Sequence, residues 1–123
     1  MTFSRIDHVA LEVADLERSV RFYRDNFGFV LYSDQTTPTG LRIFYLKLGG
    51  TVLELMGRQA STMGGFHFCV MTDDFDKAVA ALTRAGIRTL MQPHSISARE
   101  PGEEGWRRAV FEGPDGEQVE IRG

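Results

Sequence analysis

Apolar and polar residues alternate along several short segments, a pattern typical of strands that bury one face. In residues 6–13, Val9, Leu11 and Val13 fall on one face of an extended chain. His8 falls on the opposite face. Glycine-containing turns such as Gly49-Gly50 separate segments of this kind. The predicted strands are residues 6–13, 29–36, 41–48, 51–56, 65–72, 87–92, 106–112 and 117–122.

Two other segments repeat apolar residues every three or four positions, which predicts amphipathic helices. The first begins after Asp15, whose short side chain can cap a helix N-terminus, and ends at Gly28. The second begins after Asp74 and ends at Gly86. Each helix therefore presents one apolar stripe to a sheet. The stripe residues are Leu16, Val20, Tyr23 and Phe27 in the first helix, and Phe75, Val79 and Leu82 in the second.

The second half of the chain repeats the order of the first. In both halves seven positions separate a histidine from the capping aspartate, and four separate a glycine from a glutamate in the last strand. We interpret the chain as one α+β domain, residues 1–123, made of two strand–helix–three-strand (βαβββ) modules, residues 5–57 and 64–122. The matching residues are His8, Asp15, Gly50 and Glu54 in the first half, and His67, Asp74, Gly116 and Glu120 in the second.

Composition excludes several classes of protein. With 123 residues, 42% of them hydrophobic and 25% charged, the chain has the size and composition of one globular domain. A net charge of −3 without a basic tract argues against nucleic acid as a partner. The lone Cys69 excludes an internal disulfide and a zinc finger. The N-terminal segment has no apolar core of a secretion signal, and no run reaches the roughly 18 apolar residues of a membrane span, so we expect a cytoplasmic protein without membrane contact.

Each half contributes one histidine near its start and one glutamate on its last strand. Both glutamates stand between apolar neighbours, so their carboxylates face away from the side that packs on the helices. If the two halves curl toward each other, the four side chains line one cleft. We therefore predict a metal site whose ligands are His8, Glu54, His67 and Glu120.

This donor set suits one divalent ion of intermediate hardness, namely Ni, Co, Mn, Fe or Zn. An octahedral ion would keep two positions free for water or for two neighbouring oxygens of a substrate. Such a Lewis acid stabilises an enediolate, and Glu120 or Glu54 can also move the proton, which makes them the candidate catalytic residues. Any one of these residues taken alone is more often an ordinary surface or structural residue; the prediction depends on the repeated pattern.

The same segments resemble the vicinal oxygen chelate superfamily, which includes glyoxalase I, methylmalonyl-CoA epimerase, extradiol dioxygenases and bleomycin-resistance proteins. The resemblance covers about residues 5–122. It implies paired βαβββ modules around a U-shaped metal cleft in a homodimer, with the site either within one chain or across two. A second chain would also cover exposed sheet edges. The segments that carry the resemblance are IDHVALEV with His8, DLERSVRFYRDNFGF, TVLELM with Glu54, GGFHFCV with His67, and GPDGEQVEI with Glu120.

The resemblance leaves three functions open. The complete His/Glu/His/Glu set is similar to bacterial glyoxalase I and the epimerases, which favours a metal-dependent lyase or isomerase. Iron dioxygenases match His8, His67 and Glu120 but have no ligand at the position of Glu54. The third function is a non-catalytic small-molecule-binding protein of the bleomycin-resistance type, a branch that generally lacks the ligands.

Two features favour a small substrate with vicinal oxygens over a large thiol conjugate. Glu12 stands in the first strand, a few residues past the histidine, where the bacterial glyoxalase carries a glutathione-binding arginine. Only 13 positions separate Glu54 from His67, which is a short linker for that family. Apolar side chains are candidates for lining the cleft; they are Phe44, Met56, Cys69 and Met71.

The segment 93–105 is rich in Pro, Gly, Ser and charge, and we expect a mobile loop there. It is either a lid over the site, with His94 and Arg99 near a ligand, or a solvated hairpin loop without a role. The strand that follows opens with Trp106, Arg107 and Arg108. An arginine at that place either binds a substrate carboxylate or is a surface charge.

Overall fold

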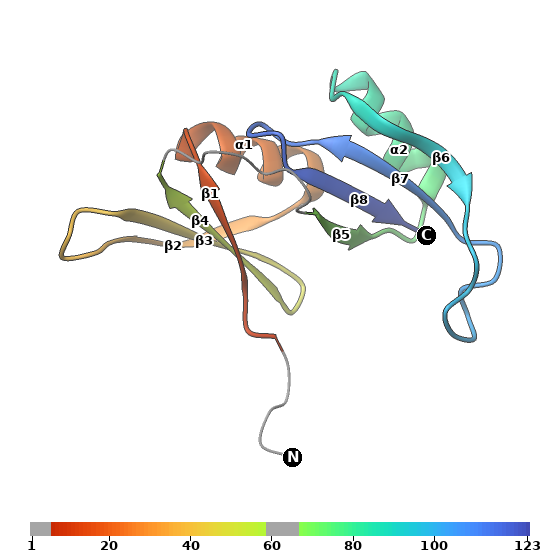
Figure 1. The fold of residues 1–123 in the computed structure, drawn as a ribbon, viewed down its shortest axis with the longest axis horizontal. Coiled ribbons are helices and arrows are strands. Elements are labelled where there is room, and N and C mark those ends of the chain that lie inside the picture. Colours follow the sequence, from red (N-terminus) through yellow and green to blue (C-terminus); the bar gives the residue numbers. More distant parts are fainter. Residues whose placement is uncertain (1–5, 59–66) are drawn as a thin grey trace, which may run out of the picture. The chain divides into compact units, whose positions relative to one another are not determined.

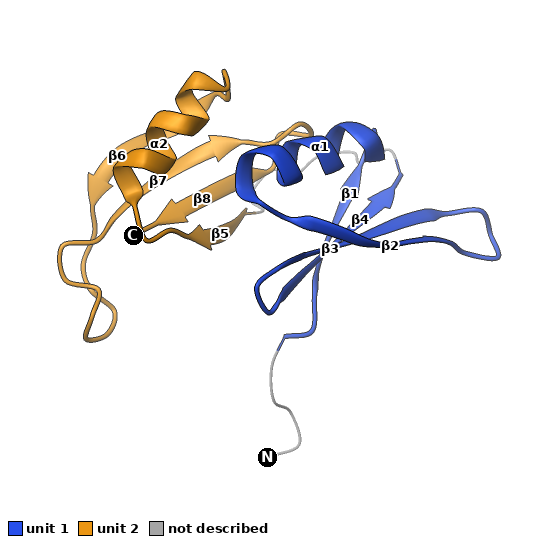
Figure 2. Cartoon of the chain, turned by 180° about the vertical axis from the view of Figure 1, so that it is seen from behind, with its two compact units in different colours: residues 1–61 blue, residues 62–123 orange. Residues whose placement is uncertain are grey.

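A computed structural model describes residues 6–58 and 67–123 of the chain. The chain divides into two compact units, residues 1–61 and 62–123, coloured separately in Figure 2. In its described residues, each unit contains one helix and one four-stranded sheet. The α+β fold with two such helix-and-sheet units confirms the fold class predicted from the sequence.

Unit 1 begins with a strand and a helix, followed by an antiparallel group of three strands (Figure 1). The sheet has the strand order β1-β4-β3-β2, in which β1 pairs with β4 in parallel and the other neighbours are antiparallel. The first and last strands of the unit are therefore adjacent. The elements are β1 (Val9–Val13), α1 (Leu16–Phe27), β2 (Val30–Thr36), β3 (Arg42–Leu48) and β4 (Thr51–Gly57).

Unit 2 has the same topology. Its sheet has the order β5-β8-β7-β6, again with a parallel pair formed by the first and last strands of the unit. The two halves that share histidine and glutamate positions in the sequence therefore also share their strand order. The elements are β5 (His67–Met71), α2 (Phe75–Arg84), β6 (Thr89–Ser95), β7 (Arg107–Glu112) and β8 (Gln118–Arg122).

Both helices begin at the aspartates that the sequence predicts as caps. The Asp15 side chain accepts a hydrogen bond from the backbone N–H of Arg18 at 3.0 Å, and Asp74 accepts one from Lys77 at 3.1 Å. Helix α1 ends at Gly28, which adopts a left-handed φ of 79° that residues with a side chain rarely tolerate.

The core of each unit lies between its helix and one face of its sheet. In unit 1 the buried face of α1 meets β4 so closely that a Cβ at Gly57 would lie 2.8 Å from Cδ1 of Leu16. In unit 2 the guanidinium of Arg107 lies 4.6 Å from the ring centre of Phe75, so this arginine faces α2. The buried apolar residues of the two sheets are Leu11, Val13, Phe44, Leu46, Leu53 and Leu55 in unit 1, and Ala109, Val110, Phe111, Val119 and Ile121 in unit 2.

Two expectations need correction. Phe44 is only 2% exposed and packs in the core, because its register partner on β4 is the buried Leu55, so it does not line a cleft. The expected mobile loop 93–105 is also shorter, because β6 continues to Ser95 along the edge of its sheet. The start of the remaining loop is tied down by Arg99, which contacts Glu103.

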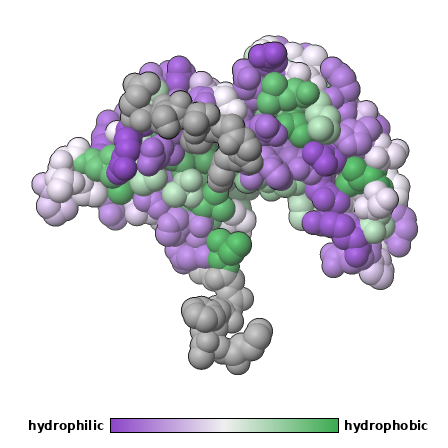
Figure 3. Space-filling view, in the orientation of Figure 1, coloured by the Kyte–Doolittle hydropathy of each residue, from purple (hydrophilic) through white to green (hydrophobic). Residues whose placement is uncertain are grey.

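Polar side chains cover most of the face drawn in Figure 3, with separate hydrophobic patches between them. Within residues 6–58 and 67–123, no helix is long and apolar enough to cross a membrane.

Candidate functional site

Strand register decides which side chains lie on the face of each sheet away from its helix, which we call the open face. In unit 1, Leu53 and Leu55 are buried on the helix side, so Glu54 between them lies on the open face. Its register partners are Ala10 on β1 and Tyr45 on β3. Glu54 is nevertheless only 8% exposed, because its neighbours cover it.

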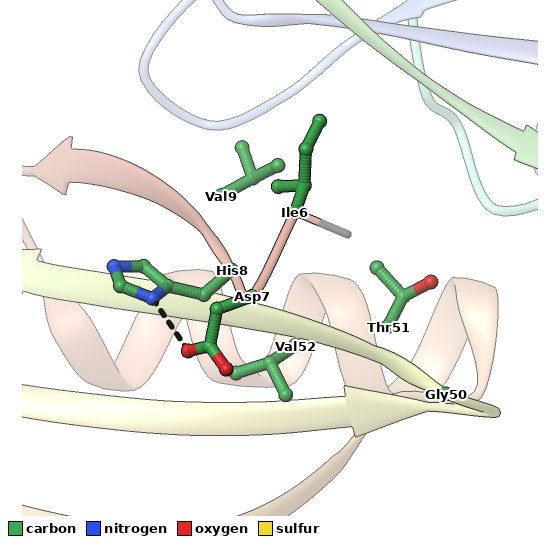
Figure 4. Close-up of a pocket in the computed structure, with 7 residues that line it drawn as sticks. All are labelled: Ile6, Asp7, His8, Val9, Gly50, Thr51 and Val52. Carbon is green, nitrogen blue, oxygen red and sulfur yellow. Dashed lines mark hydrogen bonds and ion pairs between the residues drawn. The ribbon is translucent and has the colours of Figure 1, made fainter. Parts of the chain in front are cut away.

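The imidazole of His8 lies between two carboxylates. Its Nε2 is 2.9 Å from Oε2 of Glu54, and its Nδ1 is 3.0 Å from Oδ2 of Asp7. The hydrogen bond to Asp7 raises the pKa of His8 above its ordinary value, and the negative charge of Glu54 adds to this effect. Figure 4 shows the contact between His8 and Asp7. A carboxylate on one ring nitrogen fixes the imidazole so that the other nitrogen can serve as a metal ligand.

Tyr45 is a further neighbour of this pair that is not among the residues predicted from the sequence. Burial raises the pKa of its phenol, and the negative charge of Glu54 and a hydrogen bond to it raise that pKa further. The signal was available, because the β3–β4 hairpin turns at Gly49-Gly50 and its register places Tyr45 opposite Glu54.

Unit 2 repeats the arrangement around its own histidine. Nε2 of His67 lies 3.8 Å from Oε2 of Glu120, whose residue is 5% exposed. Glu120 pairs in register with Cys69, two residues after His67, as Glu54 pairs with Ala10, two residues after His8. Arg108 supplies a second neighbour, with its Nε 3.6 Å from Oε1 of Glu120.

The four predicted ligands therefore form two pairs: His8 with Glu54 in unit 1, and His67 with Glu120 in unit 2. Within the described parts of the chain, no group of three or more histidine, cysteine, aspartate or glutamate side chains is arranged to hold a metal ion. Each pair offers one imidazole nitrogen and one nearly buried carboxylate, and both donors suit a divalent ion of intermediate hardness. The donor chemistry of the residues present fits such an ion, and the four-ligand set remains a prediction.

A shallow pocket of about 240 Å³ lies beside His8 (Figure 4). Its walls are the segment from Ile6 to Val9, the turn residue Gly50, and the first two residues of β4, Thr51 and Val52. A second pocket of about 400 Å³ shares Asp7 and Val52, and adds Tyr32 and Lys47. Nζ of Lys47 lies 4.3 Å from the ring centre of Tyr32, so a cation and an aromatic ring border this space.

Cys69 lies on the open face of unit 2, where it pairs in register with Glu120. Desolvation raises the pKa of its thiol to about 11, and the negative charge of Glu120 contributes. A thiol with this pKa is protonated at neutral pH, and the thiolate is the nucleophilic form.

The two residues singled out in the expected loop differ in their surroundings. Nδ1 of His94 lies 2.9 Å from the carbonyl oxygen of Gln92 on its own strand. Arg99 binds the buried carboxylate of Glu103 through its backbone N–H and its guanidinium, at 2.9, 3.1 and 2.6 Å. These contacts hold the pKa of Glu103 down at about 2. Arg99 thus orders the loop.

Three comparisons with known proteins bear on this site. A family model described as Glyoxalase/Bleomycin resistance protein/Dioxygenase superfamily matches residues 5–121. Human mitochondrial methylmalonyl-CoA epimerase is 32% identical over 107 residues, which span 76% of this chain and 61% of the human enzyme. The ethylmalonyl-CoA/methylmalonyl-CoA epimerase of Cereibacter sphaeroides is 30% identical over 70% of this chain and 74% of its own length.

Among solved structures, TnmS3, an antibiotic binding protein from Streptomyces sp. CB03234, has a TM-score of 0.77 and 28% identity. That match covers 98% of this chain and 96% of TnmS3. The chain thus resembles both enzymes and a binding protein, and it spans about three fifths of the length of the human relative.

Proposed function

The chain belongs to the Glyoxalase/Bleomycin resistance protein/Dioxygenase superfamily, and from this premise we propose that it is a divalent-metal-dependent lyase or isomerase. Its substrate is a small molecule with two adjacent oxygens. The observation that supports the proposal is the repeated pair of a histidine Nε2 and a nearly buried glutamate, at 2.9 Å in unit 1 and 3.8 Å in unit 2. Epimerases among the relatives favour the isomerase form of the reaction.

His8, Glu54, His67 and Glu120 would hold the ion, which when bound supplies a Lewis acid to polarise the substrate oxygens. Asp7 keeps the imidazole of His8 oriented with Nε2 toward Glu54. Glu54 and Glu120 lie among neighbours that exclude most water, so their carboxylate oxygens keep their places without a hydration shell.

Glu120 or Glu54 takes a proton from the substrate carbon next to a carbonyl and returns it. A carboxylate can do both steps because it stays in hydrogen-bond reach of that carbon during the reaction. Return of the proton by the same carboxylate to a neighbouring atom gives an isomer. An epimer forms when one of the two carboxylates takes the proton from one face and the other delivers a proton to the opposite face.

Hydrogen exchange at the acidic carbon tests this proposal directly. The metal-loaded protein is incubated in D₂O with methylmalonyl-CoA, with the hemithioacetal of a 2-oxoaldehyde, and with smaller 2-hydroxy ketones, and deuterium uptake is followed by NMR. We expect uptake with one of these classes and its loss in Glu120→Gln with an unchanged far-UV spectrum. Full uptake in both Glu120→Gln and Glu54→Gln would contradict the proton-transfer role.

The likeness to TnmS3 favours one second function, the metal-free binding of an apolar small molecule. In that case affinity for the ligand survives complete removal of metal and both glutamine substitutions. The D₂O experiment separates the two functions, because a binding protein exchanges no substrate hydrogen.

We also propose that the chain forms a homodimer. Strand β2 is an edge of the unit 1 sheet and exposes the apolar side chains of Val30, Leu31 and Tyr32, which are 62%, 38% and 48% exposed. Apolar edge strands are normally covered, because open edges promote aggregation. Light scattering coupled to gel filtration would give twice the chain mass, and a chain mass of 13.8 kDa would contradict the dimer.

A further inference from the structure

Two arginines face each other on the open face of the unit 2 sheet. Arg108 on β7 and Arg122 on β8 are register partners in neighbouring strands (Figure 1). The preceding residue, Arg107, faces α2, where it contacts Phe75 and Asp76, so Arg108 projects to the other face. Like charges directly opposite each other on a sheet destabilise it, so this pair needs an explanation.

The neighbouring carboxylates form ion pairs with the two guanidinium groups but no hydrogen bonds. Nη2 of Arg122 lies 3.7 Å from Oε1 of Glu103, and Nε of Arg108 lies 3.6 Å from Oε1 of Glu120. Both separations are too long for hydrogen bonds. Glu103 is already engaged, because its two carboxylate oxygens accept three hydrogen bonds from Arg99.

The Nε atoms of Arg108 and Arg122 are buried and have no hydrogen-bond partner. Within residues 6–58 and 67–123, they are the two buried side-chain nitrogen or oxygen atoms in this condition. The Arg122 side chain is only 15% exposed and that of Arg108 is 32% exposed, so water satisfies them incompletely. Buried donors of charged groups are costly to leave unpaired, which points to a missing acceptor.

The position of the pair connects it to the candidate site. Arg108 and Arg122 occupy the row of the sheet next to Glu120, and Arg108 is itself a neighbour of that carboxylate. Both guanidinium groups therefore lie on the same face of the sheet as Glu120, one row along.

We propose that Arg108 and Arg122 form an anion subsite that binds a carboxylate group of the substrate beside His67 and Glu120. The planar guanidinium matches a carboxylate with two parallel N–H···O bonds, and a pair of guanidinium groups can hold both oxygens. This inference rests on the proposed function for its substrate, and it restricts the substrate class to molecules with a free carboxylate next to the reacting oxygens.

The test uses malonate, a small dicarboxylate, as the probe. Calorimetric titration of the full chain, free of chelators and of other carboxylate buffers, measures its affinity with and without added divalent metal. We expect Arg108→Gln and Arg122→Gln each to weaken malonate binding about tenfold or more, since each removes charged hydrogen bonds. Malonamide, which has the same shape without charge, is expected not to bind.

Arg84→Gln is the matched control, because it removes the same charge from the exposed side of α2. We expect it to leave malonate affinity unchanged. Arg122→Lys keeps the charge but lacks the planar guanidinium, so its affinity for malonate should fall between those of wild type and Arg122→Gln. If Arg122→Gln fails to fold, Arg122→Lys still tests the role of Arg122. Thermal unfolding of every variant identifies loss of fold.

The outcomes also separate this inference from the proposed function. Malonate binding that depends on Arg108 and Arg122, in a protein that retains no divalent ion after loading with any of the metals, would support the subsite and contradict the metal-dependent enzyme. Equal malonate affinity in wild type, Arg108→Gln and Arg122→Gln, or no affinity at all, would overturn the subsite whatever the metal content. If a substrate with a carboxylate group is found, and Arg108→Gln raises its KM with little change in kcat, both the anion subsite and the proposed function would be supported.

Discussion

His8 shows how one residue can belong both to the fold and to the chemistry. Its Nδ1 contacts Asp7 at 3.0 Å and its Nε2 contacts Glu54 at 2.9 Å. The first contact orients the ring, and the second places it beside a nearly buried carboxylate. The sequence predicts His8 and Glu54 because they recur in both halves, whereas Asp7 has no counterpart at the same position before His67, where Phe66 stands.

Substitution of Asp7 tests this orientation. We expect Asp7→Asn to lower the affinity for the divalent ion about 10-fold to 100-fold, because the imidazole loses the carboxylate that orients it and increases its basicity. Competition with a coloured chelator measures the affinity. Asp73→Asn, an exposed aspartate before α2, is the control and should leave the affinity unchanged. Equal affinities in both variants would show that Asp7 does not orient the ligand.

Glu103 provides a pH-dependent contribution to stability. Arg99 lowers the pKa of this carboxyl from 4.5 to about 2 in the folded protein. A lowered pKa in the folded state means that the stabilisation is present above pH 4.5 and is lost as the pH falls toward 2. The expected result is that Glu103→Gln lowers the free energy of unfolding at pH 7 and that the difference from wild type shrinks toward pH 2. Urea titrations across this range measure it, and a difference independent of pH would contradict the pairing.

At the scale of elements, hydropathy and capping residues are enough to predict both helices and the approximate position of every strand that the structure describes. Local signals determine these elements: Asp15 and Asp74 accept the free N–H groups of the first helical turn, and alternation selects the buried strand face. The end of β6 was missed because Pro93 argues against a strand, and an edge strand with a register shift tolerates it. The anchoring of the following loop depends on Arg99 and Glu103, a contact without a sequence pattern.

The packing of α1 on β4 makes a prediction at Gly57. A Cβ there would lie 2.8 Å from Cδ1 of Leu16 and 3.4 Å from the carbonyl oxygen of Arg42. We expect Gly57→Ala to lower the free energy of unfolding by about 1–3 kcal/mol, because the buried Leu16 side chain must move to make room. Urea denaturation measures this value.

Gly50→Ala is the control, since no atom lies within 4 Å of a Cβ at that position. Its stability should stay within about 0.5 kcal/mol of wild type. If Gly57→Ala and Gly50→Ala lowered the free energy of unfolding equally, the close approach of α1 to β4 would not explain the loss of stability at position 57.

At the scale of the whole molecule, the repeat links the fold to the function. Two units with the same strand order each place one histidine Nε2 next to one nearly buried glutamate. The sequence predicts the members of both pairs, because strand parity and equal spacing are properties of a single chain. The register of the β3–β4 hairpin also places Tyr45 opposite Glu54, whereas hydropathy alone does not show the Arg108–Arg122 pair, which comes from the pairing of β7 with β8.

The most direct test of the account is the metal content of the purified, tag-free protein after chelation and reloading with Ni, Co, Mn, Fe and Zn. Elemental analysis of wild type is compared with Glu54→Ala and Glu120→Ala, which remove one ligand from each unit. We predict about one ion per site in wild type and clearly weaker retention in both variants. No bound ion under any loading condition, or equal retention in all three proteins, would contradict the metal centre.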